Sequence, residues 1–205
     1  MTEQSTFIEK VKDNQQKRKS FEELMKLYKK AKEAGFYLEC LWIIYAMLED
    51  RTSAFLYHLG FTSANNRNRV TGTKKIRNDV VTLFNIDIDK PRYNFNSLAG
   101  KINRINTLFA NQERDNLVLT DFQSTIFKTI EFIKDLDLTE KLTYLETEWI
   151  TKRNQLTHAL FSKQFDAARD ETKILCEKGF EVVRRLDLAA KKIKRKHIRS
   201  KYNIQ

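Results

Sequence analysis

Arg153, Asn154 and His158 lie close together in the sequence and are of types that act on phosphate groups. A histidine can accept or deliver a proton near neutral pH, because its unperturbed pKa is about 6.5. An arginine can neutralise charge that develops on phosphate oxygens. Asn154, directly after the arginine, can hold the guanidinium or a phosphate oxygen. Together these residue types could support acid/base chemistry at a phosphate ester.

The helix that carries these residues is predicted to begin near Thr139. Its apolar stripe comprises Leu142, Leu145, Trp149, Leu156 and Leu160. At about 100° per residue, Arg153 falls inside this stripe, where packing alone would favour an apolar residue. A charge directed at the core is unusual unless a partner pairs with it or a reaction uses it. Positions 153 and 158 are about 140° apart on an ideal helix, so a shared site requires two subunits or a local helix distortion.

A second arginine–histidine pair, Arg51 and His58, lies on a hydrophobic helix predicted from Phe36 to Leu59. The two residues are seven positions apart and therefore share one face of that helix, beside its apolar stripe. They fit an ordinary surface pair, and they also fit a phosphate-binding pair. We predict a supporting role in RNA binding for both.

The sequence is strongly basic, with a formal net charge of +11 and a pI of about 9.6. Such a charge predicts a polyanionic partner, either nucleic acid or an anionic membrane, and its clustering favours nucleic acid. One cluster, in a loop over residues 61–78, fits a solvated connection and a phosphate-contacting loop equally well. The other lies at 184–201, where nine Lys or Arg residues accompany a single acid, Asp187. The predicted RNA-binding residues from these clusters are Arg67, Arg69, Lys74, Lys75, Arg77, Lys192, Arg195 and Lys196.

Other kinds of site are not indicated by the sequence. Cys40 and Cys176 lack metal-ligand spacing and lie in apolar helical patterns, which predicts small buried side chains in a reducing compartment. No glycine-rich phosphate loop or nucleophilic triad is recognisable, and we expect neither a metal nor a cofactor. The N-terminus has no apolar signal region and the longest apolar run is too short to span a bilayer. We therefore expect a cytoplasmic protein with no membrane partner.

The fold class expected from the composition is all-α. One proline and five glycines in 205 residues leave few points where helices must break. We predict a single domain over residues 1–205, in which a helical extension at 1–35 precedes a core bundle at 36–201. Ser20 with Glu23, and Thr120 with Gln123, have the spacing of helix-capping boxes. The last helix is expected to run from Asp166 to about Lys201.

The motif from Arg153 to His158 resembles the signature of the HEPN superfamily of helical-bundle ribonucleases. In that signature a polar residue follows the arginine, and the histidine comes after four to six intervening residues on a late helix. The architectural resemblance covers about residues 36–201. In one branch, paired with nucleotidyltransferase antitoxins, a tyrosine stands two places after the histidine; here that position is Leu160.

The resemblance implies a metal-independent endoribonuclease that acts as a toxin or an antiviral-defence effector. It also implies a homodimer in which two motifs face one cleft, and an antitoxin or defence-system protein as a further partner. In this interpretation His158 is the general acid/base and Arg153 stabilises the transferring phosphate. Asn154 orients one of these two side chains. The alternatives are a non-catalytic RNA- or DNA-binding protein, supported by the basic segments, and a module that only binds a protein.

Overall fold

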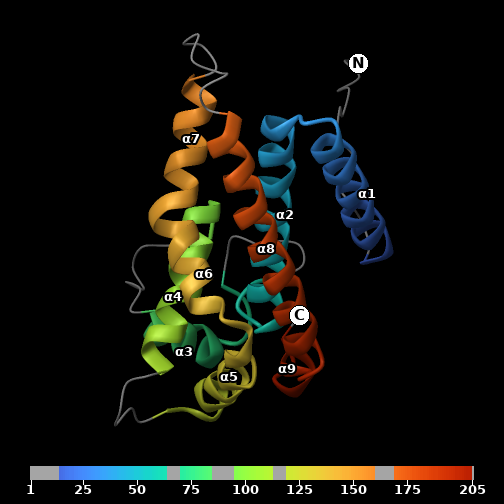
Figure 1. Ribbon diagram of the computed structural model, residues 1–205. Helices are drawn as coiled ribbons and strands as arrows, with labels where there is room; N and C mark the ends of the chain where they lie inside the picture. Colours follow the sequence, from blue (N-terminus) through green and yellow to red (C-terminus); the bar gives the residue numbers. More distant parts are fainter. Residues whose placement is uncertain (1–13, 64–69, 85–94, 113–118, 160–168, 205) are drawn as a thin grey trace, which may run out of the picture.

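The computed structural model describes residues 14–63, 70–84, 95–112, 119–159 and 169–204. Within these ranges the chain is helical, apart from turns and one isolated antiparallel bridge between Thr62 and Val70 (Figure 1). The predicted all-α class is therefore confirmed. Arg67 and Arg69 lie outside the described residues.

Helices α2 (Tyr37–His58) and α8 (Arg169–Lys194) form the centre of the bundle and run parallel to each other (Figure 1). The Cys176 thiol donates to the carbonyl of Tyr37 at 3.0 Å, and farther along both helices Arg51 donates to Asp187 at 2.6 Å. Residues near the start of α2 therefore contact residues near the start of α8, as expected for parallel helices. Both cysteines are buried between the helices, as the sequence predicted.

Helix α1 (Asn14–Glu33) packs antiparallel against α2. The ring of Tyr28 stacks on Phe180 of α8, with ring centroids 4.2 Å apart, and anchors the C-terminal half of α1 to the core. The capping box predicted at Ser20 is wrong, because α1 continues through that position. After the end of α1, Gly35 turns the chain with φ of +75°, a conformation that glycine adopts without steric cost.

A single long helical segment consists of α6 (Leu138–Tyr144), a π-helical turn η2 (Leu145–Trp149) and α7 (Ile150–Ala159). It runs antiparallel to α8, beside α2 and on the side away from α1 (Figure 1). The buried indole of Trp149 donates to the carbonyl of Leu175 at 2.9 Å and fixes η2 to α8. The π-helical turn η2 is therefore the point at which this segment is hydrogen-bonded to α8.

Helices α3 (Lys74–Phe84), α4 (Leu98–Gln112) and α5 (Asp121–Phe132) pack against one another; α3 and α5 lie at the lower end of the bundle in Figure 1. The predicted capping box at the start of α5 is confirmed. Thr120 accepts from the backbone N–H of Gln123 while the Gln123 side chain accepts from the N–H of Thr120. A 3-10 turn (Lys134–Leu136) then leads into α6.

The C-terminal basic segment is not one continuous helix. Helix α8 ends at Lys194, and His197 adopts a left-handed conformation with φ of +51° before the short helix α9 (Ile198–Lys201). A non-glycine residue in this conformation interrupts helical hydrogen bonding. The turn lets Ile198 and Ile204 pack into the core. Within the described ranges, no helix combines the length and apolar character needed to cross a bilayer.

Candidate functional site

Arg153 lies half-buried on α7 with its guanidinium against two aromatic rings of α2. The guanidinium carbon is 4.3 Å from the ring centroid of Trp42 and 4.6 Å from that of Tyr45. The expectation that Arg153 points into the core is therefore wrong. Trp42 is 53% exposed and provides a surface on which the arginine rests.

The neighbours of Arg153 fix its orientation. Its Nη1 donates to Oδ1 of the exposed Asn154 at 3.0 Å. Cation–π contacts to two rings hold the guanidinium plane while other N–H groups remain for a ligand. Burial and the nearby Glu49 raise the pKa of Tyr45, and Arg153 acts in the opposite direction. Tyr45 is thus a neutral ring beside a cation.

Position 158 falls in the last turn of α7, five residues after Arg153, whereas the His158 side chain lies outside the described residues. The helix is regular from Ile150 to Ala159, so the two positions remain about 140° apart around its axis. The π-helical distortion precedes Ile150 and leaves this angle unchanged. Of the two explanations considered for the angular mismatch, a helix distortion is therefore excluded between these two positions.

Arg51 and His58 lie together on another face of α2, facing α1 and α8. Arg51 forms ion pairs with Asp50 and Asp187, and its guanidinium carbon lies 4.1 Å from the ring centroid of Phe21. Burial, followed by the charges of Lys194, Arg199 and Arg51, lowers the pKa of His58 to about 4. His58 is consequently neutral at pH 7. Its positive surroundings make it unsuitable as a protonated general acid.

These two residues line an open groove of about 1350 Å³. The groove runs between α1, α2, the C-terminal end of α8 and the α9 segment. Arg153 is not among its lining residues. From Trp42 to His58 the distance along α2 is about 24 Å at 1.5 Å per residue. The structure therefore separates the two arginine–histidine pairs into two regions instead of combining them in one site.

The other predicted RNA-binding residues are dispersed over the surface. Lys74, Lys75 and Arg77 are exposed on α3, and Arg195 is exposed after the end of α8. On another face of α8, the Nζ of Lys192 donates to both carboxylate oxygens of Asp135, at 3.0 and 2.9 Å. The Nζ of Lys196 lies 3.6 Å from the ring centroid of Phe132. Lys192 is thus neutralised, whereas the exposed cation of Lys196 faces an exposed ring.

Sequence reasoning missed Trp42 and Tyr45 as partners of Arg153, and it missed the contribution of α1 and α9 to the groove. The spacing of Trp42 and Tyr45, three residues apart, marks a shared helix face but does not indicate which helix covers it. In the part of the chain that the structure describes, no cluster of three or more His, Cys, Asp or Glu residues could hold a metal ion. Comparisons with protein-family models, curated proteins and solved structures found no match.

Proposed function

We propose that the protein is a metal-independent endoribonuclease of the HEPN type, and that Arg153, Asn154 and His158 form its catalytic motif. The observation that carries the proposal is the setting of Arg153. It is a surface guanidinium held by Trp42, Tyr45 and Asn154, with no carboxylate partner among the described residues. Such a cation is oriented but not neutralised, which suits it to a phosphate.

The reaction follows from the chemistry of RNA. The 2′-oxygen attacks the adjacent phosphorus, the bond from phosphorus to the 5′-oxygen breaks, and a 2′,3′-cyclic phosphate forms. One proton leaves the 2′-OH and one reaches the 5′-oxygen leaving group, which are the transfers that a histidine near neutral pKa can perform. Arg153 stabilises the charge on the non-bridging oxygens. We assign the proton transfers to His158.

A homodimer completes the proposal. Because positions 153 and 158 differ by about 140° on a regular helix, a composite site uses Arg153 of one copy and His158 of the other. The exposed face around Trp42 and α7 is the surface that we expect near the dimer axis. The protein would act in the cytoplasm as a toxin or antiviral-defence effector, under the control of an antitoxin or another defence protein. Its two free, buried cysteines suit a reducing compartment.

The decisive experiment incubates the purified protein with total RNA in the presence of EDTA and analyses the RNA by length. Cleavage that persists in EDTA and is abolished in Arg153→Ala supports the proposal. Intact RNA at micromolar dimer concentration argues for the second candidate, a non-catalytic RNA-binding protein. That candidate is favoured by one observation, the basic groove at Arg51 and His58.

A further inference from the structure

The carboxylates that line the groove between α1, α2, α8 and α9 are all paired with cations of the protein. Three carboxylates line it, those of Glu22, Asp50 and Asp187, and each forms an ion pair. The guanidinium of Arg51 alone bridges Asp50 and Asp187. The acidic groups of the groove are therefore neutralised within the protein.

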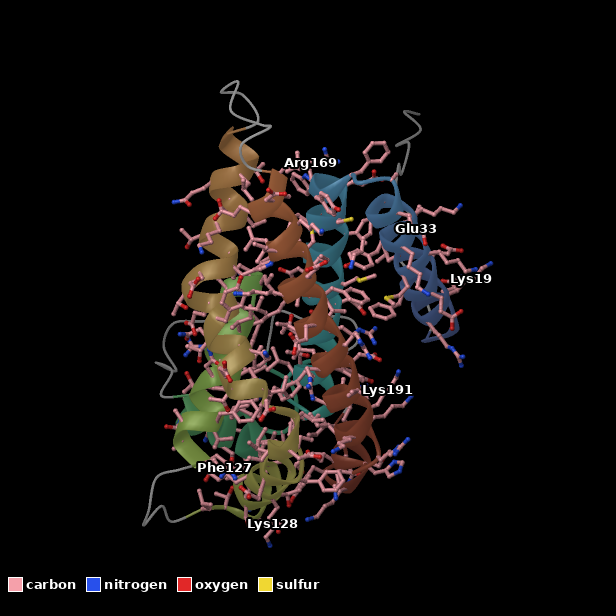
Figure 2. The ribbon with its side chains drawn as sticks, in the orientation of Figure 1. Lys19, Glu33, Phe127, Lys128, Arg169 and Lys191 are labelled. Carbon is pink, nitrogen blue, oxygen red and sulfur yellow. The ribbon has the colours of Figure 1, made fainter. Side chains whose placement is uncertain are left out.

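Arg18 and Lys191 also pair with carboxylates of the groove, whereas four other cations that line it are not neutralised. Among the described residues, the ammonium groups of Lys26, Lys29 and Lys194 have no hydrogen-bond or ion-pair partner. In the described part of the chain, Arg199 donates to two backbone carbonyls, those of Tyr57 and Thr62, which do not cancel its charge. The groove thus carries an excess of positive charge supplied by three different elements. In Figure 2 its position is marked by Lys191, which lines the groove from α8.

The aromatic rings that line the groove are already covered. The guanidinium of Arg51 lies 4.1 Å from the Phe21 ring centroid, and that of Arg199 lies 4.0 Å from the Tyr57 ring centroid. On the ring face that each arginine covers, a base could stack only by displacing the guanidinium. The groove consequently offers charge to a ligand and little base stacking, a combination that suits a phosphate backbone.

The position of His58 supports the same conclusion. Its half-buried imidazole lies near Lys194, Arg199 and Arg51, and these cations contribute to its low pKa of about 4. The groove carboxylates of Asp50 and Asp187 are engaged by Arg51. An anion that entered the groove would offset this positive potential and would make protonation of His58 easier.

We propose that this groove binds the sugar–phosphate backbone of a single RNA strand without selecting bases. The choice of RNA as the polyanion rests on the proposed function, whereas binding itself does not require cleavage. The concave shape between helices admits a strand but not a flat bilayer surface. Because the groove lies on another face of α2 and Arg153 is not among its lining residues, it would hold RNA beyond the site of cleavage.

The test measures binding of the full-length protein to fluorescent oligouridylate by anisotropy at several salt concentrations, in EDTA. The groove variant is Lys26→Gln, Lys29→Gln and Lys194→Gln combined. The matched control is Lys19→Gln, Lys128→Gln and Lys173→Gln combined. It removes the same charge from exposed lysines that do not line the groove, and two of its positions are labelled in Figure 2. Both variants are checked for native circular dichroism.

We expect the groove variant to bind at least about tenfold more weakly than the control. The slope of log K against log salt should become shallower by about 0.7 for each phosphate that is no longer neutralised, or by roughly 2 when all three lysines are replaced. In NMR titrations, bound oligouridylate should raise the pKa of His58, whose signals are assigned with His58→Gln.

Equal weakening in the two variants would overturn the proposal, and so would binding to anionic vesicles but not to oligouridylate. Cleavage is measured separately. If the groove variant binds RNA more weakly but the wild-type protein cleaves no RNA, only the proposed nuclease activity is refuted. If the wild-type protein cleaves RNA but the groove variant binds it as tightly as the control, only the proposed groove is refuted.

Discussion

The guanidinium carbon of Arg153 lies 4.3 Å from the ring centroid of Trp42, so a residue of α7 is held by an exposed aromatic of α2. The contact explains how a charge can interrupt an apolar stripe without entering the core. Stacking on a ring requires a planar, weakly hydrated cation, which an arginine provides better than a lysine. Trp42 is therefore expected to position Arg153 for phosphate binding.

Trp42→Leu should lower the rate of RNA cleavage about tenfold at saturating RNA while leaving the free energy of unfolding within about 1 kcal/mol, because the ring is half exposed. Arg153→Lys should be impaired more strongly, since an ammonium cannot reproduce the planar fork. Single-turnover cleavage assays and urea unfolding measure the two effects. A fully active Trp42→Leu enzyme would show that the stack has no positioning role.

His158→Ala should reduce cleavage by about 10²- to 10⁴-fold, the usual cost of losing a positioned acid or base. RNA binding should persist, because the basic groove is lined by residues other than those of the catalytic motif. The matched control is His58→Ala, which should alter affinity more than the rate at saturating RNA. If His58→Ala were inactive and His158→Ala still cleaved RNA, the catalytic assignment would move to the groove.

The sequence predicted the helical elements well because apolar periodicity and capping residues act locally. Neighbouring residues were enough to recognise the helix of Tyr37–His58, predicted from Phe36 to Leu59, and the capping box of Thr120. Whether Arg153 is buried depends on the neighbouring helix, and no local pattern specifies that Trp42 lies across from it. The break at His197 was missed for a similar reason, since buried contacts of α9 stabilise an unfavourable backbone conformation.

His58 should make the stability of the protein depend on pH. Its folded pKa is lowered to about 4 from an ordinary value near 6.5, so the unfolded state binds the proton more tightly. The resulting stability is present above about pH 6.5 and is lost as the pH falls toward 4.

Between pH 7 and 5, His58→Gln should lose less stability than the wild type, by about 1 kcal/mol after allowance for partial exposure. Urea unfolding at the two pH values measures this difference. Carboxylates titrate in both proteins and cancel in the comparison. Parallel losses in the two proteins would mean that His58 has an ordinary pKa.

Gly179 provides a test of how closely α8 approaches its neighbours. A Cβ at this position would lie 2.6 Å from Nε1 of Trp149 and 3.0 Å from Cγ2 of Ile44. The indole uses the resulting space to reach the carbonyl of Leu175. Replacing a helical glycine by alanine ordinarily stabilises a helix by about 1 kcal/mol. Here the added methyl group collides with a buried ring and with α2.

Gly179→Ala should therefore destabilise the protein by about 2 to 4 kcal/mol, whereas Gly100→Ala, in the first turn of α4, should be neutral or slightly stabilising. Combining Gly179→Ala with Trp149→Phe removes the closest clashing atom, so the double variant should lose less stability than the sum of the single variants. Urea denaturation of the wild type, Gly179→Ala, Trp149→Phe and the double variant measures the coupling between positions 149 and 179. An additive result, or a Gly179→Ala protein as stable as the wild type, would show that α8 does not pack against η2 at this distance.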